Sequence, residues 1–400
     1  MSSPLYSYTY CIPYIAIFLL FVFWSFSIHT KSNAINIGYT MLQRYAVGAV
    51  FIVFIALRGF VETDWVNYYP LYQDAPSLFG NTDVIKYLEG FGSEQLFYVY
   101  TVLCKTVSEN YFFFQALSSI IDFFIIYYFF TTYIPGYPVL GFVFFFIFSG
   151  IEMEFNLLRD AKSIMLFLIS IQYIKKRKIL RYVLCNIIGS FFHVSSLLYI
   201  PLYFFLHKRI HKAVIFIIFL FGHVLFLTGT MWLKGLLVLI SGISDNRLFL
   251  LIQRYLANDY YSREWGVGIG YFERLLYFLL IFILYDKLLK KSESNILFVN
   301  LAFIYWILYL YCAEMYIIMR RIPILFVCSL WVLFPHIYSI LSKQLKYIFI
   351  LLLLIYGPLK LSFNHGVNAL YESAFTHSNY AQRAALTQRI TADVVRAAGK

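Results

Sequence analysis

The sequence predicts an all-α polytopic membrane protein, and three observations support this fold class. Of the 400 residues, 61% are hydrophobic and only 13% are charged, and the mean hydropathy is +0.73. A soluble domain of this size could not bury so much apolar side chain. Most of the apolar residues fall into runs of about 15 to 25 residues, the length of a helix that crosses a bilayer. Short basic turns separate several of these runs.

The apolar runs predict roughly 11 to 13 membrane-spanning helices within residues 1–362. The longer runs are Tyr10–Ile28, Ile37–Leu57, Tyr111–Thr131, Pro138–Ile151, Leu157–Ile174, Tyr182–Leu206, Val214–Met231, Gly268–Asp286, Ile296–Tyr311, Pro323–Leu341 and Tyr347–Leu361. Two shorter pieces, Glu94–Thr106 and Trp232–Ile243, are expected to cross, re-enter or lie in the interface. Met1–Tyr10 has no basic segment of the kind that opens a cleavable signal peptide, so the spans themselves are expected to direct the chain to the membrane.

The basic turns predict the orientation of the chain and explain its net charge of +12 without nucleic acid. Turns rich in Lys and Arg face the cytoplasm, which here places Lys175–Arg181, Lys287–Lys291 and Ser342–Lys346 inside. The segments 58–92 and 244–266 are then outer loops, and the first is rich in acids. The basic turn His207–Lys212 conflicts with this order: either the helix breaks near Pro201 and turns back, or the charge rule fails there.

Two segments outside the spans have helical patterns. In Ser244–Trp265, apolar residues recur at helical spacing with Arg247 and Arg254 on the polar side, which predicts an amphipathic helix on the membrane surface. The C-terminal tail, 363–400, loses the aromatic richness, and Ala384–Gly399 is expected to form an amphipathic helix.

The first outer loop combines a charge pair with aromatic rings. Arg58, Asp64, Trp65 and Tyr68 lie within one short stretch, RGFVETDWVNYY. Rings beside carboxylates suit a sugar site, because the ring stacks on the C–H face while the acid takes the hydroxyls. The alternative is an aromatic belt at the membrane interface, but a belt needs no acid such as Asp64.

Arg159 lies at the entrance of a span, three residues after Asn156. On a helix that begins near Asn156, these two residues and Ser163 would share a face. The planar guanidinium presents a fork of donors that matches phosphate oxygens. The alternative is an interfacial Arg whose side chain reaches the lipid headgroups.

His193 belongs to a polar stripe with Asn186, Ser190 and Ser196 along the predicted span Tyr182–Leu206. Such a stripe is expected to face other helices. The His is therefore a candidate proton carrier or a donor to a sugar hydroxyl or phosphate. The alternative is a hydrogen bond between two helices.

Several arginines fall near the outer side of the predicted membrane. They are Arg58, Arg159, Arg254, Arg274 and Arg320. Their convergence would suit an anionic, lipid-linked substrate such as a polyprenyl pyrophosphate. No His and acid residues group at the spacing of a metal site, so no metal is expected.

Taken in order, these motifs resemble the EpsG family of Wzy-like polysaccharide polymerases. The resemblance rests on the stretches RGFVETDWVNYY, GSEQLFYVYTVL, NLLRDAKSIMLFLISIQYIKKRK and SFFHVSSLLYIPLYFF, and covers residues of about 40 to 360. The chain departs from the family pattern at Ser93-Glu94-Gln95, where an acid-Pro-Gly is frequent, and at Asp160, where a Gln is frequent.

The resemblance implies a bacterial inner-membrane enzyme with a GT-C-like helical core. Such an enzyme transfers a growing O-antigen or exopolysaccharide chain from undecaprenyl pyrophosphate to an incoming lipid-linked repeat unit on the outer face. It needs no nucleotide sugar or metal, and its partners are membrane lipids and a chain-length regulator protein. We expect Arg159, with Arg58, Arg274 and Arg320, to bind the pyrophosphate, and Asp64 or His193 to act as the base.

Two alternative functions share this substrate. A flippase for the lipid-linked oligosaccharide would place its basic residues near mid-membrane and often shows a pseudo-repeat, whereas these residues lie near one face and no repeat is evident. An O-antigen ligase would use the same donor chemistry with a different acceptor, and the sequence does not separate it from a polymerase.

Overall fold

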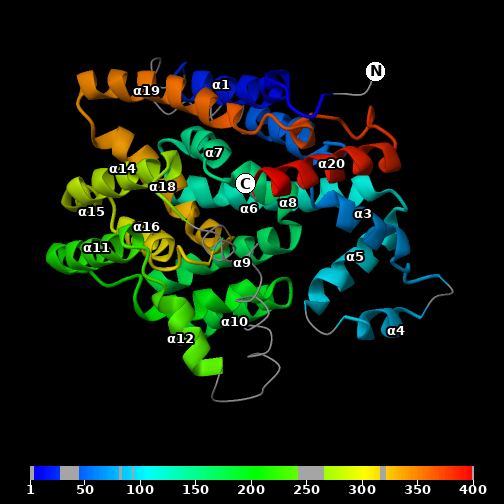
Figure 1. Cartoon of the computed structure of the whole chain (residues 1–400), viewed down its shortest axis with the longest axis horizontal. Coiled ribbons are helices and arrows are strands. Elements are labelled where there is room, and N and C mark those ends of the chain that lie inside the picture. The colour runs from blue at the N-terminus through cyan, green and yellow to red at the C-terminus, as the bar shows by residue number, and fades with distance from the viewer. Residues whose placement is uncertain are drawn as a thin grey trace. The chain divides into compact units, whose positions relative to one another are not determined.

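The regular elements of the protein are helices throughout the part of the chain that the structure describes (Figure 1). This structure is a computed structural model that describes residues 4–27, 45–80, 83–91, 94–241, 265–315 and 321–398. Three described helices are long and apolar enough to cross a membrane, Tyr8–Phe26, Tyr111–Tyr133 and Lys343–Ser362. A fourth arises if the helix pair Pro138–Ile147 and Gly150–Asn156, bent by 65°, is one span. The all-α membrane class is therefore confirmed.

Several of the expected spans are divided between shorter helices. The described apolar helices of 10–17 residues are Tyr45–Ala56, Ile179–Ser190, Val194–Phe204, Lys212–Leu227, Asn295–Tyr311 and Cys328–Ile340. The short apolar piece after Glu94 is a helix of 13 residues, α5 (Gln95–Val107). At 1.5 Å per residue it reaches about 20 Å, less than the thickness of a bilayer core.

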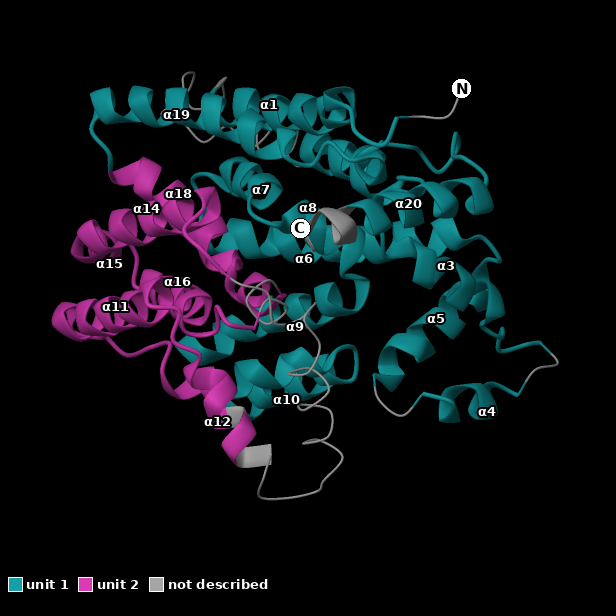
Figure 2. Ribbon diagram, viewed as in Figure 1, with its two compact units in different colours: residues 1–200, 341–400 teal, residues 201–340 magenta. Residues whose placement is uncertain are grey.

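The chain forms two compact units, which Figure 2 colours separately. Unit 1 holds residues 1–200 and 341–400, so it includes the C-terminal tail, and unit 2 holds residues 201–340. The main helices of unit 1 are α1 (Ile12–Ser27), α3 (Trp65–Asp74), α4 (Val84–Glu89), α5, α6 (Tyr111–Tyr133), α7 (Pro138–Ile147), α8 (Gly150–Asn156), α9 (Leu158–Lys175), α10 (Ile179–Ser190), α19 (Lys343–Ser362) and α20 (Tyr380–Ala398). Those of unit 2 are α11 (Lys212–Leu227), α12 (Trp232–Ser241), α14 (Ile269–Ile283), α15 (Tyr285–Lys291), α16 (Asn295–Tyr311) and α18 (Cys328–Ile340).

In unit 1, α1 packs along α7 and α19 (Figure 1). The contact between α1 and α19 is close because α19 has a glycine there: a Cβ on Gly357 would lie 2.1 Å from the ring of Phe18. Phe21 of α1 stacks on Phe142 of α7 at 6.0 Å between ring centroids. Phenylalanines thus supply much of the contact between these helices, as the aromatic content of the sequence suggests.

Inside unit 1, α6 and α9 are joined by a buried ion pair. The Lys162 ammonium lies 2.5 Å from the Asp122 carboxylate and also donates to the Ser118 carbonyl at 2.9 Å. A buried charge is costly unless it is paired and hydrogen-bonded. This pair therefore fixes the rotation of α9, and with it the position of the helix entrance that carries Arg159.

The predicted single span Tyr182–Leu206 is wrong, because the chain reverses within it. Helix α10 ends at Ser190, and the 3-10 helix η3 (Val194–Phe204) returns along it. The Tyr182 hydroxyl donates to the Tyr199 carbonyl at 2.6 Å. The two segments also meet closely at Gly189, where a Cβ would lie 2.3 Å from the Ser196 hydroxyl. The chain does turn back, but at 191–193 and not near Pro201, which removes the conflict between the basic turn His207–Lys212 and the charge rule.

In unit 2, α11 and α14 pack through aromatic rings, and Phe219 stacks on Phe278 at 3.9 Å between centroids. The Asn300 amide of α16 donates to the carbonyls of Leu206 and Lys208, each at 2.8 Å. These bonds give hydrogen-bond partners to two backbone carbonyls near the start of the unit. The predicted surface helix in 244–266 and the Arg254 that it carries lie outside the described residues, apart from 265 and 266.

The C-terminal tail packs against the first outer loop. The expected helix exists as α20. Arg383 on α20 is 1% exposed and donates to the carbonyls of Phe60 at 3.0 Å and Leu370 at 2.7 Å. The tail therefore fixes the position of the loop that leads to Asp64.

Candidate functional site

Four segments of unit 1 bring charged side chains together. They are α3, the start of α5, the start of α9, and the turn between α10 and η3. The Leu96 amide at the start of α5 donates to the Phe191 carbonyl in that turn, at 3.0 Å. This backbone bond sets Glu94 beside His193, although the two residues are far apart in the sequence.

Arg159 and Asp160 occupy the first turn of α9, directly after a break in the helix. The predicted helix through Asn156, Arg159 and Ser163 is wrong: α8 ends at Asn156, and Leu157 separates it from α9. Asn156 therefore faces a different segment from Arg159. Its side-chain oxygen accepts the backbone N–H of Thr63 at 2.9 Å and that of Asp64 at 3.3 Å.

The Arg159 guanidinium lies between a carboxylate and a phenol. Its Nη1 is 2.5 Å from Glu94 Oε2, and its Nε donates to the Tyr68 hydroxyl at 3.4 Å. The Arg159 side chain is 37% exposed, whereas that of Glu94 is 8% exposed. The site therefore presents part of a guanidinium at its surface and keeps the matching carboxylate behind it.

His193 lies between two carboxylates. Its Nδ1 contacts Glu94 Oε1, and its Nε2 lies 2.9 Å from Asp160 Oδ1. Ionised carboxylates accept hydrogen bonds and do not donate them, so both ring nitrogens must carry a proton. His193 is then an imidazolium that joins two acids. The predicted polar stripe does not exist on one helix, because the turn at 191–193 separates Asn186 and Ser190 from Ser196.

Glu94 connects these groups, and it was not among the predicted site residues. Oε1 also accepts the Val194 amide at 3.4 Å. The residue adopts the left-handed backbone region with φ of 63°, which non-glycine residues rarely enter and which persists only where contacts impose it. Burial alone would raise the pKa of the Glu94 carboxyl, but the bond and charge of His193, with the charge of Arg159, hold it below its ordinary value. A lone acid before an apolar run was the available sequence signal.

Asp160 was also missed as a contributor to the site. Its Oδ1 accepts the Ser195 hydroxyl at 2.8 Å as well as His193. A carboxylate is favourable in the first turn of a helix, where the backbone N–H groups give the helix end a partial positive charge. Asp160 therefore joins α9 to η3 and orients the imidazole.

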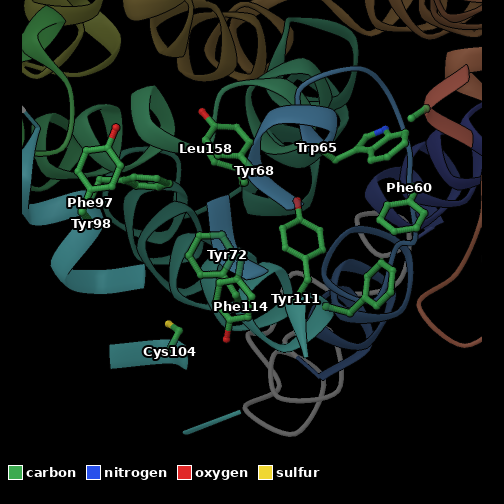
Figure 3. Close-up of a cluster of buried hydrophobic side chains, with 12 residues drawn as sticks. Phe60, Trp65, Tyr68, Tyr72, Phe97, Tyr98, Cys104, Tyr111, Phe114 and Leu158 are labelled. Carbon is green, nitrogen blue, oxygen red and sulfur yellow. The ribbon is translucent and has the colours of Figure 1, made fainter. Parts of the chain in front are cut away.

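Tyr68 and Trp65 both lie on α3, but they have different surroundings. Trp65 is 2% exposed and lies in a cluster of buried aromatic rings that Figure 3 shows, with Phe60 at 4.4 Å between ring centroids. Tyr68 belongs to the same cluster, but its hydroxyl receives the bond from Arg159. Burial and the charge of Asp64 raise the pKa of Tyr68 to about 12 against the opposing effect of Arg159, so the phenol stays neutral.

The carboxylate of Glu62 anchors the outer loop next to Asp64. It is 6% exposed and accepts the side-chain amides of Asn156 at 3.4 Å, Asn368 at 2.9 Å and Asn364. Burial raises the pKa of Glu62, and the three amides act in the opposite direction. Asp64 is partly exposed and begins α3: its carbonyl accepts the amides of Asn67 at 2.9 Å and Tyr68 at 3.2 Å.

Of the other predicted arginines, Arg58 makes its contacts elsewhere in unit 1, and Arg274 belongs to the other unit. Arg58 is 1% exposed and donates to the carbonyls of Ile55 and Glu154, each at 2.6 Å. Arg274 belongs to unit 2, where it donates to the Tyr305 hydroxyl at 3.1 Å and to the Gly270 carbonyl at 2.9 Å. Arg254 and Arg320 lie outside the described residues.

The cluster has the groups for acid and base chemistry on an anion. Two cations, Arg159 and His193, alternate with two carboxylates, Glu94 and Asp160. Among the described residues, no group of three or more His, Cys, Asp or Glu side chains is placed to hold a metal ion. The arrangement can bind a phosphate at Arg159 and can take a proton at a carboxylate beside it.

The EpsG family matches residues 41–375, which is most of the chain and includes the whole cluster. No curated protein and no solved structure matches.

Proposed function

We propose a specific reaction for this chain, which belongs to the EpsG family. Membership of this family indicates a polysaccharide polymerase in the general sense. The enzyme transfers a glycan chain from undecaprenyl pyrophosphate to the terminal sugar of an incoming lipid-linked repeat unit. It does so in the bacterial inner membrane, with a GT-C-like helical core and an active site on the outer face. The product is an O-antigen or exopolysaccharide.

The single observation that carries this proposal is the partly exposed Arg159 beside the buried Glu94. Breaking the bond between a sugar and a pyrophosphate moves negative charge onto the leaving oxygen, and a fixed guanidinium stabilises that charge. The attacking hydroxyl must lose a proton to a base. A polymerase therefore needs a phosphate-binding cation within a few ångströms of an acid, and this cluster supplies both.

The orientation of the site is inferred from charge. The first outer loop carries Glu62, Asp64, Asp74, Asp83 and Glu89, whereas the turn after α9 carries three lysines and two arginines within 175–181. Helix α9 thus has Arg159 at one end and the basic turn at the other. Since basic turns face the cytoplasm, the end with Arg159 faces outward.

The two residues proposed as catalytic from sequence have distinct roles in this proposal. His193, held between Glu94 and Asp160, is suited to orient carboxylates and to add positive charge, and less suited to accept a proton. Asp64 is partly exposed at the start of α3 and is suited to accept hydrogen bonds from sugar hydroxyls.

The glycan of a strain that lacks the gene tests the proposal. A polymerase mutant keeps surface glycan of a single repeat unit and loses the long chains. Loss of every surface repeat would instead indicate a ligase or a flippase, and an unchanged ladder of chain lengths would exclude all three functions.

A further inference from the structure

The contact between Glu94 and Arg159 has a consequence for the reaction, given the proposed function. The one guanidinium of the cluster, 37% exposed, is already bound to a carboxylate, at 2.5 Å. A carboxylate and a phosphate use the same donors of an arginine fork. A pyrophosphate that binds Arg159 must therefore compete with Glu94.

We propose that Glu94 is the catalytic base, and that the donor pyrophosphate activates it by displacing its Oε2 from Arg159. This inference rests on the proposed function, because it takes the anion at Arg159 to be the pyrophosphate of a lipid-linked saccharide. It assigns Glu94 a role in place of the two residues, Asp64 and His193, that the sequence suggested for the base.

The surroundings of Glu94 allow one oxygen to move while the other stays. Oε1 has two partners, the His193 imidazole and the Val194 amide at 3.4 Å. Oε2 has Arg159 as its partner. His193 is itself fixed by Asp160 on its other nitrogen. Rotation of the carboxylate about its bond to His193 would therefore turn Oε2 from Arg159 toward a neighbouring sugar.

The negative charge of the donor pyrophosphate should make Glu94 a better base as well as displace it from Arg159. In the structure, the positive charges of Arg159 and His193 favour the ionised carboxylate. A bound pyrophosphate neutralises Arg159 and adds negative charge nearby. Both effects raise the proton affinity of Glu94, which is 8% exposed and so is poorly screened by water. The base thus gains strength only when the donor is in place.

The reaction then balances with the groups already named. The hydroxyl oxygen of the acceptor sugar forms a bond to the anomeric carbon of the donor. The bond between that carbon and the phosphate oxygen breaks, and its electron pair leaves with the pyrophosphate, which Arg159 stabilises. The hydroxyl proton passes to Glu94 Oε2. Departure of the pyrophosphate lets Glu94 lose this proton to water and return to Arg159.

Two measurements on the same variants test the inference. Binding is measured by titrating farnesyl pyrophosphate into the purified, full-length protein in nanodiscs. Polymerisation is measured from the ladder of glycan lengths in a deletion strain that expresses each variant at equal membrane level. The variants are Glu94→Gln and, as a matched control in the loop that precedes it, Glu89→Gln, whose side chain is exposed.

Glu94→Gln should bind farnesyl pyrophosphate more tightly than wild type, by about three- to tenfold, because the competing carboxylate is gone. It should also polymerise about 100-fold more slowly or worse, because an amide cannot accept the proton. Glu89→Gln should match wild type in both measurements. Tighter binding also shows that the variant is folded.

Unchanged or weaker binding by Glu94→Gln would overturn the inference, because Glu94 would then hold Arg159 in position and would not compete with the substrate. Near-normal polymerisation would also overturn it and return the role of base to Asp64. If Glu94→Gln does not accumulate in the membrane, Glu94→Asp makes the same test, since its shorter carboxylate should release Arg159, bind the probe more tightly and retain partial activity. Weaker binding by Glu94→Asp would likewise overturn the inference.

Arg159→Ala separates this inference from the proposed function. If Arg159→Ala binds farnesyl pyrophosphate as well as wild type does, the phosphate site lies elsewhere and the proposed use of Arg159 fails. If Arg159→Ala loses binding while Glu94→Gln does not gain it, the phosphate site stands and only the displacement of Glu94 is wrong.

Discussion

At the residue scale, Arg159 is held at two of its nitrogens, by Glu94 on Nη1 and by Tyr68 on Nε. These bonds fix the plane of the guanidinium at the entrance of α9, with 37% of the side chain exposed. An arginine that merely reached the lipid headgroups would not need a buried carboxylate and a neutral phenol to orient it. We therefore expect the planar geometry of the Arg159 guanidinium, and not its charge alone, to be needed for function.

Arg159→Lys should fail nearly as badly as Arg159→Ala. Lysine keeps the positive charge but offers a point ammonium where a planar fork contacts two phosphate oxygens. Loss of such a contact costs about 2 to 4 kcal/mol, or about 30- to 1000-fold in rate. The measurement is the glycan ladder of a complemented deletion strain, with Arg181→Lys, on an exposed residue of the basic turn, as the control. A normal ladder from Arg159→Lys would remove Arg159 from the site.

Asp64→Asn and His193→Ala should each reduce polymerisation by about 100-fold or more, without loss of protein from the membrane. The first removes a proposed acceptor of sugar hydroxyls, and the second removes the imidazole that joins Glu94 to Asp160. The same glycan ladder reports both, with Asp74→Asn, an exposed acid on α3, as the control. Full chain length from either variant would show that its residue is structural.

At the element scale, two helix breaks create the site. Leu157 separates α8 from α9 and exposes the first turn of α9, and the turn at 191–193 returns η3 along α10. The apolar pattern predicts where lipid-facing helices lie, but a run such as Tyr182–Leu206 has the same composition whether it crosses once or reverses. The reversal depends on the close contact of Gly189 with Ser196 and on the bond from Leu96 to Phe191. Both are contacts between distant residues that no local pattern contains.

The same limit explains which site residues were predicted. Arg159 and His193 stand out because each is a polar residue at an apolar run. Glu94 and Asp160 also lie at apolar runs, but their importance comes from partners contributed by other elements. Arg58 looked like a substrate ligand for the reason that Arg159 did, namely charge at the end of an apolar run. Only the fold shows that its donors are used by backbone carbonyls.

Asn156→Asp should destabilise the outer loop, because it would set a second carboxylate against Glu62. We expect a loss of about 1 to 3 kcal/mol, seen as a lower midpoint of thermal unfolding in detergent. Burial already raises the pKa of Glu62 in the folded state. A carboxyl group whose pKa is higher in the folded state than in the unfolded state lowers the free energy of unfolding as the pH rises. The loss of stability of Asn156→Asp relative to wild type should therefore grow above a pH of about 4.

Asn110→Asp is the matched control for that substitution. Asn110 caps α6 by accepting the Phe112 amide at 2.8 Å, and Asp is an equally good cap. Its unfolding midpoint should therefore stay at the wild-type value. An equal midpoint for Asn156→Asp would show that the bonds of Asn156 to Glu62 and to the loop do not stabilise the fold.

At the scale of the whole molecule, unit 1 contains the complete described cluster together with the C-terminal tail. The tail had no predicted role, yet Arg383 of α20 binds the carbonyls of Phe60 and Leu370, and Asn364 and Asn368 bind Glu62. The first outer loop is thus enclosed by parts of the chain more than 300 residues away. Composition could predict the membrane class, but it could not predict this enclosure, since the tail has none of the long apolar runs that mark the spans.

The outer loop should be accessible from outside the cytoplasm. In a variant that lacks the native cysteines, Asn67→Cys places a thiol on the exposed side of α3. A maleimide that does not cross the inner membrane should label it in intact cells whose outer membrane has been made permeable. A matched thiol at Lys176, in the basic turn, should react only after the inner membrane is broken. The reverse pattern would invert the topology and place the site in the cytoplasm.

The most direct test of the central claim is the reaction of the purified protein, reconstituted in liposomes, with an undecaprenyl-pyrophosphate-linked repeat unit as the sole substrate. The account predicts glycan chains that lengthen by whole repeat units, with one undecaprenyl pyrophosphate released for each bond formed, in the absence of any nucleotide sugar. Arg159→Ala protein should give neither product. Movement of the intact lipid-linked unit across the bilayer with no lengthening and no release of undecaprenyl pyrophosphate would contradict the account.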